Sequence, residues 1–421
     1  MILIGTLLLW GFNRLEGMDL SLLDAFFTST SAVCVTGLAV VDTGADFAVP
    51  SQVVLLLLIQ LGGLGVMTAT TFMFMLLRMR IGIRQRILFA GGMGLDGPSG
   101  VVRLVLRIVK ITFLIEFAMS IPLFLGFLER FDWRTSLWYS VFHSISAFCN
   151  AGFSPFSDSL GSFTFSWLVP GAVMILIVLG GAGFVVLGDL WEWIRGGKRK
   201  LSVHCKLVLL TTLWLILIGT CFFLVMEWDG ALAGMSPFMK LWNALFCAIT
   251  PRTAGFNTIS MESLSAHSFF MVMILMIIGA SPGSTGGGIK TTTFALLVSS
   301  VFFNTRGSSR LVLWHRTVPQ ETVLRAMMLF FLYLMAIVIG VFGLGTLENL
   351  SFKAVVFEVV SALGTVGLST GITADLSWAS KILLVILMFW GRIGVMTFMF
   401  SLIAKDDCDK VGYVEVSVPI G

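Results

Sequence analysis

The chain has 421 residues, of which 57% are hydrophobic and only 12% are charged, and its mean hydropathy is +0.98. This composition excludes a soluble multidomain protein and places the chain in a lipid bilayer. The formal net charge of +4 is less informative than the positions of the charged residues along the chain.

Seven apolar runs each suit a membrane-spanning helix, which needs about 20 residues. In chain order they lie near residues 51–77, 104–128, 166–190, 207–227, 268–303, 327–347 and 380–404. The opening run, residues 1–12, is too short to cross a hydrocarbon core of roughly 30 Å at about 1.5 Å per residue. A natural chain that continues upstream of it is therefore one expectation.

Basic residues gather in three of the loops between these runs, and the positive-inside rule assigns such loops to the cytoplasm. The clusters are Arg78, Arg80, Arg84 and Arg86; Arg195, Lys198, Arg199 and Lys200; and Arg306, Arg310 and Arg316. The intervening loops carry acidic residues and fewer basic ones, so we assign them to the outside. The sequence thus predicts a multi-pass protein of the plasma (inner) membrane with both termini in the cytoplasm.

One short phrase recurs at intervals of roughly 100–115 residues, which is a sign of internal repeats. The copies are SAVCVTGL at 31–38, SAFCNAGF at 146–153, CAITPRTAGF at 247–256 and SALGTVGL at 361–368. Each copy lies between two apolar runs and follows a segment of about 12–15 residues, too short to span the membrane. Such a segment suits a re-entrant helix followed by an extended return, because irregular backbone at membrane depth survives only where it lines water or protein.

The predicted fold class is therefore an all-α integral membrane protein of four helix–pore-loop–helix repeats, arranged with pseudo-fourfold symmetry around a central pore. We place the repeats at residues 1–80, 81–200, 201–316 and 317–421, the last with the C-terminal tail. Two spanning helices per repeat make the repeats parallel rather than inverted. A ring of backbone carbonyls at their turns can replace the hydration shell of a cation, and the short helices aim their negative C-terminal ends at the same place.

The four turns resemble the selectivity filters of the Trk/Ktr/HKT superfamily of potassium transporters, and the resemblance covers nearly the whole chain. It looks most similar to the KtrB-type membrane subunit, because the extra N-terminal helices of Trk-type relatives are lacking. The filter residues that the resemblance implies are Val35, Thr36, Gly37, Asn150, Ala151, Gly152, Thr253, Ala254, Gly255, Thr365, Val366 and Gly367. Serine in the first filter goes with sodium permeation in this superfamily, and glycine in all four with potassium selectivity, so potassium is the expected ion.

A single glycine of this kind also suits close helix packing or a bend, whereas four at equivalent positions favour a shared role. The neighbouring Thr36, Asn150, Thr253 and Thr365 either lend polar groups to the pore or cap the short helices.

The second helix of repeat three is broken at residues 279–290. One proline and many glycines exclude a continuous helix there. The gate residues that the resemblance implies are Ser281, Pro282, Gly283, Ser284, Thr285, Gly286, Gly287, Gly288 and Lys290. A passive kink that lets neighbouring helices approach is the alternative. A nucleotide-binding P-loop is excluded, because Ile289 separates Gly288 from Lys290.

Arg392 interrupts the last apolar run, where a charge is expected to face a cavity or a partner. It matches the family's arginine that faces the gating loop, which implies an electrostatic barrier to cations. Val395 stands where relatives often have proline. A structural ion pair is the alternative for Arg392, and paired structural roles are expected for the intramembrane Glu116 and Glu358, with a packing role for His143.

No nucleophile–base or zinc-type constellation is present, so we expect no enzymatic activity and no covalent cofactor. Resemblance to KtrB implies a homodimer that carries cytosolic nucleotide-binding regulatory subunits of the KtrA/TrkA kind, with sodium as a candidate activator. The lipid bilayer is the other expected partner, and nucleic acid is not. Two alternatives remain open: a sodium- or proton-coupled potassium carrier with a closed binding site, and a membrane ATPase or its accessory subunit.

Overall fold

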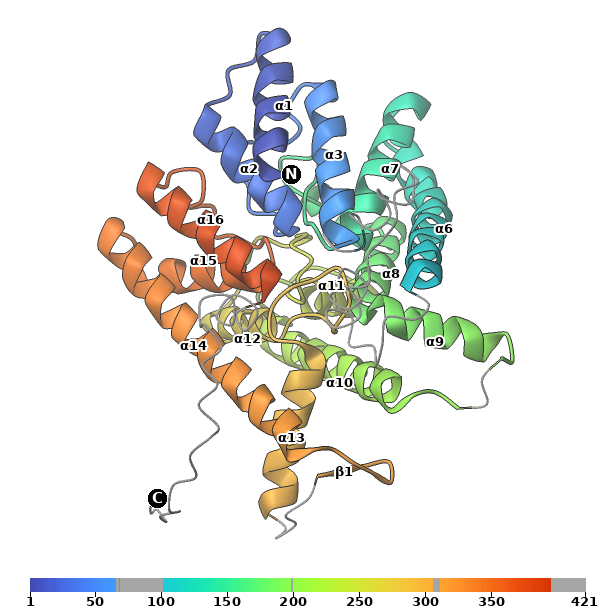
Figure 1. Ribbon diagram of the computed structural model, residues 1–421. Coiled ribbons are helices and arrows are strands. Elements are labelled where there is room, and N and C mark those ends of the chain that lie inside the picture. The colour runs from blue at the N-terminus through green and yellow to red at the C-terminus, as the bar shows by residue number, and fades with distance from the viewer. Residues whose placement is uncertain (66–67, 69–100, 198–199, 306–310, 395–421) are drawn as a thin grey trace.

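The computed structural model describes residues 1–65, 68, 101–197, 200–305 and 311–394, and within these residues the protein is almost entirely helical (Figure 1). The predicted all-α class is confirmed. The described strands are β1 (Val312–Leu313) and β2 (Arg316–Thr317), which form a small antiparallel hairpin. The basic residues 78–86, 198–199, 306 and 310, the repeat boundary at 80/81, Val395 and the C-terminal tail lie outside the described residues.

The helices form four consecutive sets that surround the centre of the molecule (Figure 1). The first set is α1 (Ile2–Leu15), α2 (Leu22–Cys34) and α3 (Val49–Gly63); the second is α6 (Val101–Leu128), α7 (Trp133–Phe148), α8 (Leu168–Ala182) and α9 (Phe184–Ile194); the third is α10 (Val203–Glu227), α11 (Pro237–Ile249), α12 (Ala266–Ile277) and α13 (Thr291–Thr305); and the fourth is α14 (Gln320–Leu347), α15 (Phe352–Gly364) and α16 (Trp378–Ile393). Short 3-10 turns lie at Gly161–Phe163 and Met261–Ser263. The predicted repeat boundaries remain predictions.

The second helix of each set, α2, α7, α11 or α15, is short and begins at a side-chain cap. Ser21, Asp132, Ser236 and Ser351 each accept a hydrogen bond from a backbone N–H of the first turn. Such caps satisfy donors that a helix start otherwise leaves without partners. With 13 to 16 residues, these helices reach only about 20–24 Å at about 1.5 Å per residue, less than the hydrocarbon thickness of a bilayer.

Neighbouring sets are joined by specific contacts. Trp138 of α7 donates a hydrogen bond to Gln52 of α3 across 3.0 Å, and Asn243 of α11 donates one to the carbonyl of Thr164 across 3.0 Å. The rings of Phe269 and Phe357 stack with centroids 4.5 Å apart between α12 and α15.

The fourth set also packs against the first. The ammonium group of Lys381 on α16 lies 2.9 Å from a carboxylate oxygen of Asp24 on α2, and both side chains are largely buried. The four sets therefore close into a ring, which brings the C-terminal ends of the short helices to its centre.

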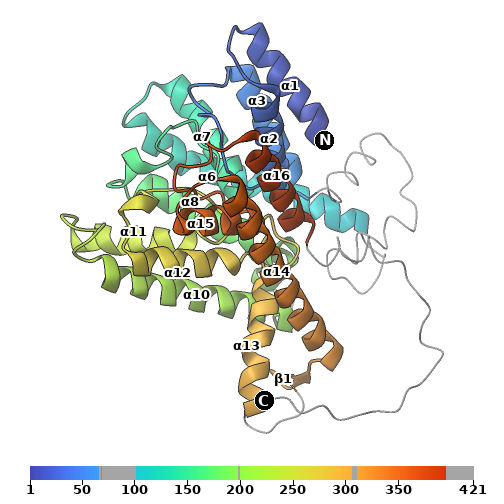
Figure 2. The same ribbon diagram turned by 90° about the vertical axis from the view of Figure 1, so that its left-hand side faces the viewer.

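The outer helices are apolar toward their surroundings, as a bilayer requires. By length and composition, α6, α10 and α14 of the described helices can each cross a membrane, and α8 with α9 makes a fourth span if the pair counts as one. Large side chains such as Phe117, Phe342 and Val225 are more than 70% exposed on these helices. Figure 2 shows α13 and the β1–β2 hairpin projecting beyond the rest of the molecule.

One predicted span is not a straight helix. The run at 166–190 is bent by 102° between α8 and α9, at Gly183. Gly183 has a φ of +93°, a conformation that L residues with side chains rarely adopt, and this ends α8. The run at 268–303 is broken into α12 and α13, at the glycine-rich segment where the sequence excludes a helix.

Candidate functional site

The four turns that follow the short helices share one backbone pattern. A non-glycine residue in the left-handed region precedes a glycine with positive φ by two positions in every turn. The pairs, with their φ angles, are Val35 (57°) and Gly37 (91°), Asn150 (58°) and Gly152 (70°), Thr253 (67°) and Gly255 (77°), and Thr365 (49°) and Gly367 (88°). Left-handed backbone at β-branched residues costs free energy and persists only where the surrounding structure enforces it.

By backbone position, Val35 is the counterpart of Asn150, Thr253 and Thr365, in the same register as the four filter segments named from the sequence. Thr36 is one residue closer to its glycine, and its hydroxyl is buried without a hydrogen-bond partner in the described part of the chain.

The four glycines lie close together, and each one contacts the turn of the next repeat in cyclic order. A Cβ atom built on Gly37 would overlap the carbonyl oxygen of Ala151, and one on Gly152 would lie 2.8 Å from that of Ala254. A Cβ on Gly255 would lie 2.5 Å from the carbonyl oxygen of Val366, and one on Gly367 would overlap that of Thr36. Each glycine therefore abuts the residue that precedes the next glycine. We call Gly37, Gly152, Gly255 and Gly367 the glycine ring.

One hydroxyl on each short helix ties the helix to its own turn. Ser31 and Ser361 accept hydrogen bonds from the N–H groups of Gly37 and Gly367, both across 3.1 Å. Ser146 donates to the carbonyl of Phe153 across 2.7 Å, and Thr250 donates to that of Phe256 across 2.5 Å. The repeated phrases contain these residues, but sequence reasoning assigned them no role. The signal was a serine at the first position of three of the four copies; in the third copy Cys247 stands there and Thr250 supplies the hydroxyl three residues later.

Further polar groups hold the outer parts of two turns. Glu358 on α15 accepts hydrogen bonds from the hydroxyls of Ser369, across 3.0 Å, and Thr373. Hydroxyl groups thus donate to this carboxylate, and no salt bridge among the described residues includes it. His143 on α7 donates through Nδ1 to the carbonyl oxygen of Tyr139, 2.8 Å away, because a carbonyl can only accept, and its Nε2 lies 3.0 Å from the hydroxyl oxygen of Ser154.

Glu116 on α6 is buried behind α7. Its side chain accepts a hydrogen bond of 3.4 Å from Gln60, and its other carboxylate oxygen has no partner among the described residues.

The segment between α12 and α13, residues 278–290, lies against residues that precede two of the ring glycines. We call this segment the barrier loop. A Cβ on Gly286 would overlap the Thr253 hydroxyl, and one on Gly287 would overlap the Thr365 hydroxyl. Only glycine permits this proximity. The loop thus contacts residues that precede the ring glycines.

Hydrogen bonds fix the barrier loop in place. Thr285 donates its hydroxyl to the carbonyl of Phe148 across 3.2 Å, and Lys290 donates to that of Gly286 across 2.8 Å. The hydroxyls of Ser281 and Thr291 lie 3.0 Å apart. The remaining gate residues from the sequence, Pro282, Gly283, Ser284 and Gly288, lie within the same loop.

Arg392, near the end of α16, reaches the barrier loop. Its guanidinium group donates hydrogen bonds to the carbonyl oxygens of Thr285 and Gly62. No carboxylate of the described residues forms a salt bridge with it. The alternative of an ion pair therefore finds no support in the described chain.

The bend at Gly183 also belongs to this site, although sequence reasoning missed it. Ser281 and Thr285 donate their backbone N–H groups to the carbonyls of Gly181 and Gly180, across 3.0 and 3.3 Å, and Phe184 donates to Gly283 across 2.9 Å. The α8–α9 bend and the barrier loop are therefore joined along the backbone.

The arrangement suits a dehydrated monovalent cation rather than a tightly held metal. Within the described residues no group of three or more His, Cys, Asp or Glu side chains could hold a metal ion. The carbonyl groups of the four turns are the oxygen ligands that remain near the glycine ring.

Comparisons with known proteins agree with this geometry. The family model of TrkH, described as a cation transport protein, matches residues 2–410. The potassium/sodium uptake protein NtpJ of Enterococcus hirae is 36% identical over 99% of this chain and 94% of its own length. The Ktr system potassium uptake protein B of Bacillus subtilis is 38% identical over 96% of this chain and 90% of its own length.

A solved structure shares the fold. The crystal structure of the potassium transporter TrkH from Vibrio parahaemolyticus matches with a TM-score of 0.77, at 19% sequence identity, over 96% of this chain and 83% of that chain. The helices of this chain and their connections thus follow a known transporter architecture.

Proposed function

Because the chain belongs to the TrkH family of cation transport proteins and is a multi-pass membrane protein rather than an enzyme, we propose that it takes up potassium ions across the plasma membrane. In this proposal the ions lose part of their hydration shell at the carbonyls around the glycine ring. The barrier loop and Arg392 gate the path, and both termini lie in the cytoplasm.

The observation that carries the proposal is the cyclic contact of the four glycines. Four turns from distant parts of the chain present backbone at one point, and the short helices end there, with their negative ends toward it. Close backbone approach without side chains is what a carbonyl-lined cation site requires.

The names of the relatives and the glycine in each of the four turns both favour potassium as the transported ion. The Bacillus subtilis and Vibrio alginolyticus Ktr system proteins, 38% and 36% identical to this chain, carry potassium uptake in their names, whereas the Enterococcus hirae relative carries both potassium and sodium. Glycine in all four turns favours potassium, and sodium as an activator is part of the proposal.

The Ktr system relatives also support a multi-subunit assembly. We propose that this chain works as a homodimer with cytosolic nucleotide-binding regulatory subunits, which contact its cytoplasmic loops and C-terminal tail.

The test is the flux of potassium and sodium into liposomes that contain the purified chain, with the membrane voltage clamped by ionophores. Potassium-selective flux that follows voltage, without a fixed sodium or proton stoichiometry, is the expected result. A fixed coupling ratio would replace the proposal by the coupled-carrier alternative. No cation flux from a folded, correctly inserted protein, with and without regulatory subunits, would overturn it.

A further inference from the structure

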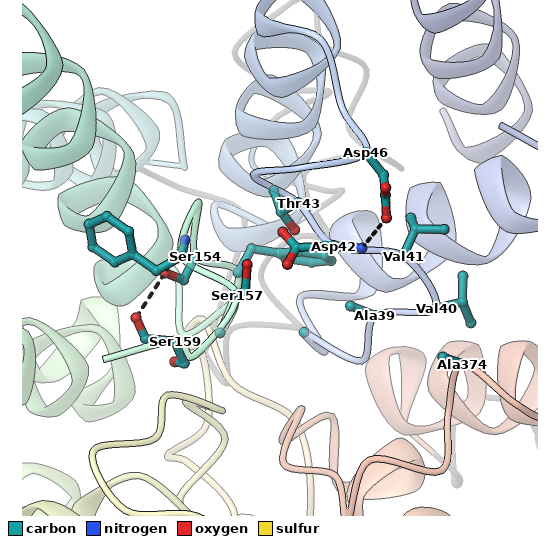
Figure 3. Close-up of a pocket in the computed structure, with 14 residues that line it drawn as sticks. Ala39, Val40, Val41, Asp42, Thr43, Asp46, Ser154, Ser157, Ser159 and Ala374 are labelled. Carbon is teal, nitrogen blue, oxygen red and sulfur yellow. Dashed lines mark hydrogen bonds between the residues drawn. The ribbon is translucent and has the colours of Figure 1, made fainter. Parts of the chain in front are cut away.

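A cavity of about 430 Å³ opens beside the glycine ring (Figure 3). Its lining includes Gly37 and Gly152 of the ring and continues along two of the returning segments, from Ala39 to Asp46 and from Phe153 to Ser159. All of these segments follow the ring glycines, whereas the barrier loop contacts residues that precede them. The cavity therefore lies on the opposite side of the ring from the barrier loop.

The carboxylate of Asp42 is held rigidly at this cavity. Its Oδ1 accepts hydrogen bonds from the N–H groups of Gly44, across 2.8 Å, and Ala45, across 3.1 Å, while its own N–H donates to Asp46 across 2.8 Å. Its Oδ2 accepts no hydrogen bond from the described residues. One carboxylate oxygen is thus fixed by the turn and the other is free to meet a ligand.

Thr43 supplies a second, independent sign of a ligand. It lines the cavity, and its residue is only 5% exposed. Its hydroxyl has no hydrogen-bond partner in the described chain, although its carbonyl accepts from Gln52 across 3.2 Å. A cation or its water in the cavity would be a hydrogen-bond or coordination partner for this hydroxyl.

The charges around the ring point to a cation. The segments that follow the four glycines, residues 38–48, 153–167, 256–265 and 368–377, contain no lysine or arginine. Their charged residues are Asp42, Asp46, Asp158, Glu262 and Asp375. A cleft lined by one sign of charge raises the local concentration of the opposite ion.

We propose that this cavity is a loading site in which a monovalent cation, still partly hydrated, is held by the Asp42 carboxylate and the Thr43 hydroxyl before it reaches the glycine ring. Carboxylate, hydroxyl and water oxygens are ligands that hard cations prefer. At about 30 Å³ per water molecule, the cavity has room for a cation with several waters. The proposal rests on the transport function proposed above.

The test is Asp42→Asn, because asparagine keeps an oxygen that can accept from the Gly44 and Ala45 N–H groups and removes only the charge. We expect the apparent KM for potassium to rise about threefold or more at low ionic strength, since the local cation concentration falls. The maximal rate and the potassium-to-sodium ratio stay unchanged. The difference from wild type shrinks in about 0.5 M choline chloride, which screens the charge.

Thr43→Val tests the contact separately and also serves if Asp42→Asn fails to fold. It removes the hydroxyl at nearly constant volume, so its rise in KM persists in choline chloride. The matched control is Asp229→Asn, which removes an exposed carboxylate between α10 and α11 that does not line the cavity. This control keeps the wild-type KM.

The outcomes separate the two proposals. Wild-type flux with an unchanged KM in both Asp42→Asn and Thr43→Val would overturn the loading site and leave the transport function standing. A KM rise of equal size in Asp229→Asn would also overturn it, because a diffuse surface charge would then explain the effect. Absence of flux in the wild type would overturn the transport function itself.

Discussion

Phe184 donates its backbone N–H to the carbonyl oxygen of Gly283 across 2.9 Å, and this bond joins the first turn of α9 to the barrier loop. Gly183, directly before it, bends the chain by 102° so that α9 leaves the axis of α8 (Figure 1). The first turn of α9 is thus bonded to the same loop whose Gly286 and Gly287 lie against Thr253 and Thr365.

Gly183→Ala is expected to loosen this connection. At a φ of +93° a Cβ atom is strained, and here it would also lie 2.7 Å from the carbonyl oxygen of Pro282. Alanine at such a position destabilises by more than about 1 kcal/mol. We expect a lower thermal unfolding midpoint in detergent and a higher basal potassium flux in liposomes, because the barrier loop loses its support.

The matched control is Gly188→Ala, also in α9. The nearest atom to its new Cβ is the Arg107 guanidinium, 4.0 Å away, so the methyl group fits. It is expected to leave flux unchanged and to stabilise the helix by roughly 0.5–1 kcal/mol. Equal unfolding midpoints and fluxes in both variants would contradict the assigned role of the bend.

Arg392→Gln removes the positive charge and the fork that binds the carbonyls of Thr285 and Gly62. We expect cation flux to rise by about tenfold, equivalent to about 1.4 kcal/mol of barrier. The flux of Arg392→Lys should lie between those of wild type and Arg392→Gln, because one ammonium group cannot reproduce the planar fork. Flux is measured in liposomes under clamped voltage.

The control for Arg392→Gln is Arg325→Gln on α14, where the arginine is exposed and pairs with Glu321. Its flux should match the wild type. A decrease in flux for Arg392→Gln, with normal folding, would show that the arginine assists permeation rather than opposing it.

The sequence indicated the short helices, the glycine turns and the helix break because these depend on local chemistry. Four copies of one phrase placed the glycines, and one proline with many glycines excluded a helix at 279–290. The bend at Gly183 was not predictable in the same way. Gly183 follows Gly180 and Gly181 in the same apolar run, and the sequence does not distinguish it from a packing glycine, whereas the structure places it against Pro282 and Gly283, about 100 residues further along the chain.

Polar character alone is a second limit of sequence reasoning, because it does not identify equivalent backbone positions. Thr36 was grouped with Asn150, Thr253 and Thr365 because it is polar, whereas backbone geometry makes Val35 their counterpart. Side-chain chemistry does not fix which residue adopts the left-handed conformation, since this depends on where the short helix ends.

Gly37→Ser is expected to disturb the glycine ring. A Cβ there would overlap the Ala151 carbonyl oxygen, so that carbonyl must shift. We expect the potassium-to-sodium flux ratio to fall several-fold, because small displacements of carbonyls change the balance between ion binding and dehydration. The ratio is measured with both ions in the same liposomes.

Gly17→Ser is the control for backbone strain alone. Gly17 also has a positive φ, of 75°, but its Cβ would meet no atom within 4 Å. It should lose some stability and keep its selectivity. Unchanged selectivity in Gly37→Ser would argue against a filter at the ring.

Ser361→Ala leaves the N–H of Gly367 without its acceptor at 3.1 Å. The full cost of about 1–3 kcal/mol applies to a buried donor without a partner, so this partly buried N–H loses less. We expect a lower unfolding midpoint and a reduced potassium-to-sodium ratio, since the turn gains freedom. Ser361→Thr keeps the hydroxyl, as Thr250 does in the third set, and should restore both properties. Loss of stability with full selectivity in the alanine variant would limit Ser361 to a structural role.

The last prediction concerns acid pH and Glu348, which follows α14. The N–H of Ser377 donates a hydrogen bond to its carboxylate across 2.7 Å, and interaction with the side chains of Ser380 and Ser377, together with this bond, holds the pKa of Glu348 below its usual range. The folded state therefore favours the charged form more than the unfolded chain does. This contribution to stability is present above the unfolded carboxyl's pKa of about 4.3 and is lost as the pH falls through the lower folded value.

Wild type should consequently unfold at a higher temperature than Glu348→Gln at pH 7. The gap between their midpoints should narrow as the pH falls from about 4.3 through the lower folded pKa, below which both carry a neutral side chain. The control is Glu321→Gln, whose side chain is 84% exposed on α14. Thermal unfolding midpoints in detergent at several pH values give the comparison. A gap that widens toward acid pH would reverse the assigned sign, because it would mean that the folded structure stabilises the protonated form of Glu348.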